Sequence, residues 1–191
     1  MQRPLTGEPL AVDLLNTRWR EGGGREVDLL GTVRGLRQWL TEVELVHTPA
    51  TEQSRLAVTH TRDVLRRVVD GEAGAADQLN AVLARGVVVR MLDEGRPGER
   101  VLIADHGWVA AWRAAQSYLD LLAETPDGVR RCASHDCILY FYDPTGRRRW
   151  CSMSGCGNRA KARRHHARHQ GRGDGSARLR SSPSADVGPG S

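Results

Sequence analysis

The spacing of apolar residues predicts a mainly helical domain over residues 1–126. In five stretches leucine, valine, alanine or tryptophan recurs at steps of three and four positions, the period that gathers side chains on one face of a helix. The pattern is clearest over 52–70, where apolar and charged residues alternate. We expect helices over 8–19, 28–43, 52–70, 75–84 and 106–124.

Turn-forming residues separate these stretches. Three glycines predict a loop over 20–28, after which Asp28 can cap the second helix. Two strand-like apolar runs, 87–92 and 100–104, flank the sequence DEGRPGE, which predicts one β-hairpin with a longer loop. The turn TPDG, 125–128, predicts a domain boundary.

Charge divides the chain into two parts. Residues 1–128 carry 15 Arg and no Lys against 19 acidic residues, a net charge of −4. Residues 129–191 carry 13 basic residues against four Asp, a net charge of +9. This asymmetry is typical of a nucleic-acid-binding end on an acidic body, although a solubilising basic tail has the same signature. Residues 171–191 are rich in Gly, Ser and Pro, and we expect a disordered tail there.

Four cysteines predict a zinc site. They form two pairs of equal spacing, Cys132-x4-Cys137 and Cys151-x4-Cys156, separated by 13 residues. Each pair can occupy a tight turn, so that four thiolates converge on one structural zinc ion, Zn2+. A segment of about 60 residues buries little surface by itself, and the metal would supply the missing stability.

Other uses of the cysteines are weaker alternatives. Two disulfides or a redox switch would also use four thiols. A nucleophilic cysteine, activated by nearby arginines, does not explain why the cysteines come in pairs. Four thiolate ligands also leave zinc no open position for catalysis, which argues against a zinc hydrolase.

The residues around the cysteines predict a small hairpin followed by a basic helix. Ile138 to Tyr142 is strand-like, and 147–150 can return to bring the cysteine pairs together. A helix is expected over 159–169, after a tight turn at Gly157 that Asn158 can cap. No acidic residue lies between 144 and 173, so a polyanion should neutralise this helix. The predicted nucleic-acid contacts are Arg147, Arg148, Arg149, Arg159, Lys161, Arg163, Arg164 and Arg168.

Some residues of this segment have structural interpretations too. Arg159 can brace the turn by hydrogen bonds to carbonyl groups. Trp150, beside a cysteine, is expected to pack over the metal site rather than stack on a base. His165 and His169 share a helix face and could bind metal, but a solvated basic face is the simpler interpretation.

These motifs resemble a known family. The letters CGNR at 156–159, preceded by RRRWCSM and Phe141-Tyr142-Asp143, closely resemble the bacterial CGNR zinc-finger family over about 131–169. DLLNT at 13–17, followed by the helix with Trp39, resembles the ABATE domain that usually precedes this finger. The turn after Asp143 is shorter than in the family.

The resemblance implies a transcription regulator described as stress-induced. A mainly helical sensor domain, residues 1–126, would respond to a ligand or signal, and a finger, residues 129–170, would bind DNA. Asp13 and Asn16 on the first helix are candidate ligand-binding residues, with capping or bracing of a neighbouring loop as the alternative. A single finger buries little DNA, so we expect a homodimer formed through the helical body.

Other functions are possible for the same residues. An RNA-binding module would use Tyr140, Phe141 or Trp150 to stack on unpaired bases. A protein-interaction adaptor would use the finger as a scaffold. An enzyme is not expected, because residues 1–128 contain no Cys and show no nucleophile–base set. The sequence lacks an apolar run long enough for a membrane span, and we expect a cytoplasmic protein.

Overall fold

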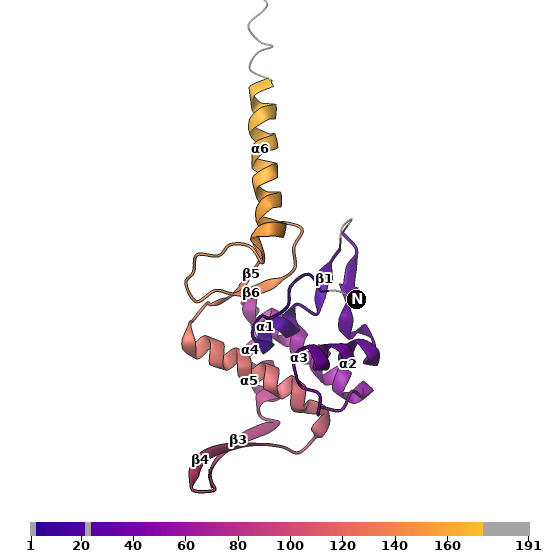
Figure 1. The fold of residues 1–191 in the computed structure, drawn as a ribbon, viewed down its shortest axis with the longest axis vertical. Coiled ribbons are helices and arrows are strands. Elements are labelled where there is room, and N and C mark those ends of the chain that lie inside the picture. The colour runs from indigo at the N-terminus through magenta and orange to yellow at the C-terminus, as the bar shows by residue number, and fades with distance from the viewer. Residues whose placement is uncertain (1–2, 22–23, 174–191) are drawn as a thin grey trace, which may run out of the picture.

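The structure has a helical body, three small β-hairpins and a long helix near its C-terminal end. It is a computed structural model that describes residues 3–21 and 24–173 (Figure 1). Within these residues no helix is long and apolar enough to cross a membrane. The elements are α1 (Leu10–Leu15), β1 (Arg18–Arg20), β2 (Glu26–Asp28), the 3-10 helix η1 (Leu29–Gly31), α2 (Val33–Glu42), α3 (Glu52–Val69), α4 (Ala75–Leu83), β3 (Gly86–Asp93), β4 (Arg96–Ile103), the 3-10 helix η2 (His106–Trp108), α5 (Val109–Glu124), β5 (Val129–Arg131), β6 (Tyr140–Tyr142), the π-helical turn η3 (Met153–Gly157) and α6 (Asn158–Gly173).

Helix α3 lies at the centre of the body. Helices α1, α2, α4 and α5 all pack against it or against each other around it. Thr51 starts α3 by accepting a hydrogen bond from the backbone N–H of Ser54. Its buried face carries Val58 and Leu65, which share one apolar core with Leu36 of α2. The mainly helical fold class predicted from the periodicity is confirmed.

The N-terminal elements differ from the prediction. The first helix ends at Leu15 rather than near 19, and the predicted loop 20–28 includes the antiparallel pair β1–β2. Trp19 and Val27 lie directly opposite each other in this pair, and both are buried. Burial of two large apolar side chains holds the strands against the core, which the glycines between them did not suggest.

Asp28 caps a different helix from the one predicted. Its carboxylate accepts a hydrogen bond from Leu30 N–H and so starts η1, whereas α2 is capped by the hydroxyl of Thr32. Asp28 also accepts two hydrogen bonds, at 2.6 and 2.8 Å, from the guanidinium of Arg62. Because Arg62 is almost fully buried, this bidentate pair compensates for the desolvation of its charge.

The β3–β4 hairpin is longer, and its turn shorter, than predicted. Asp93 pairs with Arg96, so only Glu94 and Gly95 form the turn. Both have positive φ angles, 47° and 80°, which define a type I′ turn. This turn matches the twist of paired strands, and the strands therefore extend through most of DEGRPGE instead of leaving it as a loop.

The C-terminal hairpin uses a different second strand from the one predicted. Tyr140–Tyr142 (β6) pairs with Val129–Arg131 (β5), and residues 147–150 form no strand. Phe141 and Tyr140 of β6 are buried in the same core cluster as the helical body, so the finger is seated on α1. Helix α6 extends beyond the predicted end at 169 to Gly173. Residues 171–173 of the predicted tail are therefore helical, and 174–191 lie outside the described residues.

Candidate metal centre and basic helix

The first cysteine pair is held by backbone hydrogen bonds at the end of β5. Cys132 N–H donates to Leu139 O at 2.9 Å, which continues the β5–β6 pairing by one step. Cys137 N–H donates to Ser134 O at 2.9 Å and closes the turn between the two cysteines. Ala133 N–H donates to Arg149 O, so the segment before the second pair lies beside the first, as expected, although without a strand.

The second pair lies on the turn that starts α6. Ser152 accepts a hydrogen bond from Gly155 N–H at 3.0 Å and caps the π-helical turn η3. Asn158, which the sequence offers as a cap or a brace for this turn, braces it by donating to Ser154 O at 3.2 Å. Gly157 has no positive φ, but a Cβ atom there would lie 3.0 Å from the sulfur of Met153. Glycine is thus favoured by the space beside Met153 rather than by backbone conformation, although this exposed side chain could move aside for a small residue.

The four thiols converge on one point. Their sulfur atoms all lie within 4.8 Å of one another, and all four side chains are buried. The Sγ atoms of Cys137 and Cys151 are 3.8 Å apart, and those of Cys151 and Cys156 are 3.5 Å apart. Thiolates bound to zinc at about 2.3 Å in a tetrahedron lie about 3.8 Å apart, whereas a disulfide requires about 2.05 Å. The four cysteines are therefore positioned to bind one metal ion, and the geometry fits structural Zn2+.

The thiols perturb one another strongly. Hydrogen bonds from Cys137 and Cys151 lower the pKa of Cys132, whereas the hydrogen bond to Cys132 raises the pKa of Cys137 to about 12. Packed thiols resist losing several protons because the resulting negative charges repel each other. A divalent cation removes this repulsion, so metal binding at this site releases protons and weakens as the pH falls.

Arg159 is exposed, but its guanidinium reaches back to the cysteine cluster. Its guanidinium donates a hydrogen bond to Sγ of Cys156 at 2.9 Å, and this contact with Cys156 raises the pKa of Arg159. The bracing role considered for Arg159 thus has a different acceptor, a sulfur atom rather than a carbonyl group. A cation there offsets the negative charge that four thiolates leave on a zinc ion.

Apart from Arg148, the remaining predicted nucleic-acid contacts fall into three groups. Arg147, Arg149, Lys161 and Arg164 are exposed. Arg163 forms an ion pair with Asp136, whose pKa is lowered to about 2 by His135 and then by Arg163. Arg168 belongs to α6, but its side chain lies outside the described residues.

Trp150 packs partly buried against the core cluster that contains the cysteines, and the Arg149 guanidinium lies 5.4 Å from its ring.

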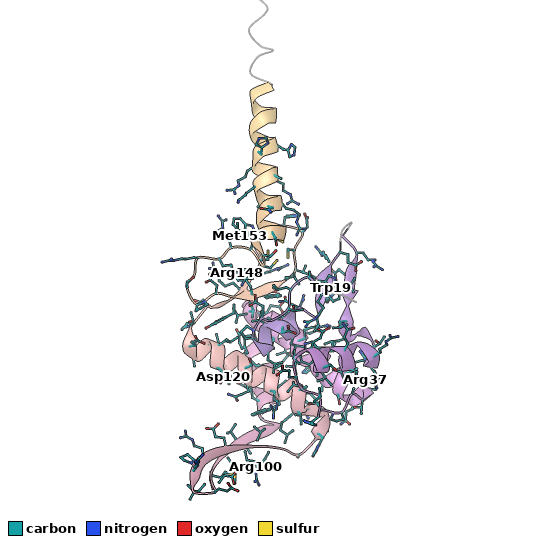
Figure 2. All side chains as sticks on the ribbon, in the orientation of Figure 1. Trp19, Arg37, Arg100, Asp120, Arg148 and Met153 are labelled. Atoms are coloured by element: carbon teal, nitrogen blue, oxygen red, sulfur yellow. The ribbon has the colours of Figure 1, made fainter. Side chains whose placement is uncertain are left out.

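Arg148, labelled in Figure 2, is partly buried and contacts both the finger and the body. Its guanidinium donates to Trp150 O and Cys151 O, forms a 3.0 Å ion pair with Glu8 and lies 4.6 Å from the ring centre of Phe141. These contacts join the segment before the second cysteine pair to the body. We therefore assign Arg148 a positioning role, and its contact with nucleic acid stays a prediction from the sequence.

Replacing Arg148 should affect stability, and replacing its neighbour should not. Arg148→Ala removes an ion pair and leaves two carbonyl groups without their donor, and we expect a loss of about 2–3 kcal/mol in the free energy of unfolding. Arg147→Ala removes an exposed side chain and should change it by less than about 0.5 kcal/mol. Urea denaturation of the zinc-loaded variants measures both. Equal stability of the two variants would contradict the assignment.

Asp13 and Asn16 are buried and engaged with protein groups. Asp13 accepts hydrogen bonds from Arg3 at 2.7 Å and from the indole N–H of Trp39 at 2.9 Å. Asn16 is fully buried and pairs with the backbone of Tyr140 in β6, accepting from its N–H at 2.8 Å and donating to its C=O at 2.9 Å. In this structure both side chains therefore join elements of the fold. They brace distant segments, not the neighbouring loop of the alternative interpretation.

Two positioning residues were missed from the sequence. Glu8 accepts hydrogen bonds from Tyr142 N–H and from Arg148, so it ties β6 to the start of the body. Asp143 accepts from Thr145 and from Arg148 N–H and shapes the turn after β6. The aromatic-x-Asp motif marked Asp143 as a family feature, but no local pattern distinguishes Glu8 from the other acidic residues.

The arrangement defines a class of protein: a helical domain joined to a four-thiolate zinc finger that ends in a basic helix. Family comparisons agree. Residues 8–125 match the ABATE model, described as "Putative stress-induced transcription regulator", and residues 129–169 match the CGNR zinc finger. The chain therefore belongs to the ABATE family and carries a CGNR zinc finger. Among curated proteins, none matches the chain.

Proposed function

We propose that the protein is a transcription regulator that binds duplex DNA through α6. The observation that carries this proposal is the form of that helix, which projects away from the rest of the molecule (Figure 1). Residues 161–166 are all exposed, and they include Lys161, Arg163 and Arg164. A projecting helix with this charge fits the major groove, where Lys and Arg contact phosphates and guanine edges.

The zinc ion would have a structural role in this function. Four thiolates fill its tetrahedral coordination shell, so it would hold the turn from which α6 starts. Arg147 and Arg149, exposed on the segment before the second cysteine pair, would add phosphate contacts near the base of the helix. The helical body would receive the signal to which the regulator responds.

The RNA-binding alternative has less support. Base stacking needs exposed aromatic rings. Trp150 is partly buried against the core cluster, and Tyr140 and Phe141 are both buried in the core. Tyr140 is further held by the Arg66 guanidinium, 5.3 Å from its ring centre. Neither ring can stack on a base without dismantling β6. A protein-interaction adaptor remains an outcome that the binding experiment separates.

Replacing two basic residues of α6 should weaken DNA binding strongly. We expect the double variant Lys161→Ala/Arg164→Ala to lose about 10-fold or more in affinity for duplex DNA and to show a salt dependence shallower by about two phosphate contacts. Fluorescence anisotropy with a labelled duplex at two salt concentrations measures both quantities. Single-stranded RNA at equal salt provides the comparison for the alternative.

A matched control removes the same charge elsewhere. Arg34→Ala/Arg37→Ala deletes two exposed arginines from α2 in the body and should leave affinity and salt dependence nearly unchanged. Arg37 is labelled in Figure 2. If both double variants bind DNA equally, α6 is not the binding element. Weak, non-saturating binding by the unmodified protein at physiological salt would favour the adaptor.

A further inference from the structure

The β3–β4 hairpin is a two-stranded sheet that projects from the end of the body opposite α6 (Figure 1). Each strand has eight residues, and within the described part of the chain neither outer edge pairs with a further strand. Two strands alone are marginally stable in water, and a long open edge is a template for pairing with another chain. The open edges of this hairpin are therefore a candidate surface for pairing with another strand.

The hairpin is also unusually apolar for an exposed element. Leu92 is 72% exposed and Val87 is 55% exposed. The exposed apolar side chains alternate between the two faces of the hairpin, so each face presents several of them. The side chains concerned are Val87, Val88, Val89, Leu92, Val101 and Leu102.

The two open edges are not equivalent. In a two-residue hairpin the pair beside the turn, Asp93 and Arg96, is hydrogen-bonded to itself, and successive pairs then alternate. The N–H groups of Val88 and Leu92 consequently face outward on β3. On β4 the corresponding outward position next to the turn is Pro97, which has no N–H to donate. The edge of β3 is thus open to pairing, whereas proline blocks part of the edge of β4.

We propose that β3 pairs antiparallel with β3 of a second copy of this chain, about a two-fold axis at Val89, to form a four-stranded sheet. In this register the outward N–H and C=O groups of Val88 meet those of Arg90 in the second copy. The register uses residues 86–92, seven of the eight in the strand. A two-fold axis at Val88 would pair only residues 86–90.

Side-chain chemistry supports the axis at Val89. Val89 then lies opposite Val89 of the second copy, and Val87 lies opposite Met91 of the second copy. One face of the sheet is therefore apolar along the whole β3–β3 interface. An axis at Arg90 would instead place Arg90 opposite itself, where like charges repel. The exposed Leu92 falls opposite Gly86 of the second copy, beside a cavity of about 600 Å³ lined by Gly86 and Val87.

Proline substitutions on the two edges test the proposal. We expect the full zinc-loaded chain to have twice its 21.0 kDa molar mass in light scattering at micromolar concentration. Val88→Pro removes an N–H that the hairpin itself does not use and should raise the dimer dissociation constant by at least about 100-fold. Val101→Pro makes the same change at the paired position of the β4 edge and should leave the dimer intact.

Cysteine cross-linking supplies a second readout that does not depend on the proline variants folding. Val89→Cys places two thiols opposite each other at a non-hydrogen-bonded pair, where the spacing suits a disulfide. We expect a covalent dimer on mild oxidation of the zinc-loaded protein, and none from Arg100→Cys on the paired strand. A monomer at every concentration, equal dimers from both proline variants, or no cross-link at residue 89 would overturn the proposal.

The inference goes beyond the proposed function and does not depend on it. Residues 86–103 lie far along the molecule from α6, so the dimer joint leaves the basic helices uncovered (Figure 1). This dimer uses the hairpin rather than the helices through which the sequence predicts dimerisation. Loss of dimerisation in Val88→Pro should leave the salt dependence of DNA binding per chain unchanged, and failure of either idea is therefore recognised separately.

Discussion

Removal of zinc should unfold the finger and abolish DNA binding. The four cysteines hold the turns on either side of β6 and the start of α6. Structural zinc contributes on the order of 10 kcal/mol to such small units, which exceeds what their limited core provides. We expect chelator-treated protein to lose the signal of α6 in circular dichroism and to bind DNA at least about 100-fold more weakly.

A single substitution should reproduce much of this effect. Cys156→Ser removes one of the four thiolates and the acceptor of the Arg159 hydrogen bond, and it lies directly before α6. Ser154→Ala, on an exposed position of the same turn, is the matched control and should bind zinc and DNA as before. Zinc content by metal analysis and anisotropy with duplex DNA provide the two measurements. If the zinc-free protein kept its DNA affinity, the basic segment would bind DNA through its charge alone and not as part of a folded finger.

Periodicity was sufficient to predict most helices because each buries one face against α3. The clearest case is α3 itself, where Val58 and Leu65 lie on the buried side and the cap at Thr51 is local in sequence. The zinc site could also be predicted from the cysteine pairs, because tetrahedral thiolate coordination restricts the spacing of the ligands. In both cases the information lies within a few residues of the element it predicts.

Long-range pairing could not be predicted in the same way. The partner of β6 was misassigned because Ile138–Tyr142 can pair with either flanking segment, and only the burial of Val129 and Tyr140 in the shared core favours β5. Glu8 is more than 130 residues from its hydrogen-bond partner Tyr142. The β1–β2 hairpin was not predicted because the glycines between its strands indicate a loop. The strands are stabilised instead by Trp19, which packs in the core.

The most informative contact that the sequence did not predict belongs to Asn16. The sequence marked it as a candidate ligand-binding residue, and the structure shows its side-chain amide paired with both backbone groups of Tyr140. The Asn16 side chain thus pairs with the free backbone edge of β6, as a neighbouring strand would. This pairing attaches the finger to the end of α1. A polar residue in a buried position within a family motif is explained here by structure that lies 124 residues away.

Asn16→Ala should therefore destabilise the body and the finger together. The substitution leaves the N–H and C=O of Tyr140 buried without partners, and each such group costs about 1–3 kcal/mol. We expect a loss of about 3 kcal/mol in the free energy of unfolding. Asn80→Ala, which truncates an exposed asparagine on α4, is the control and should change it by less than about 0.5 kcal/mol.

Two readouts decide whether the finger and the body behave as one unit. Tryptophan fluorescence in urea follows the body, which contains four of the five tryptophans, and a colorimetric zinc indicator follows the finger. Because Asn16 joins the two, both transitions should coincide in the unmodified protein and shift together in Asn16→Ala. A zinc-release midpoint that stays in place while the fluorescence transition shifts would show that the finger folds independently. The chain would then behave as the two separate domains that its sequence predicts.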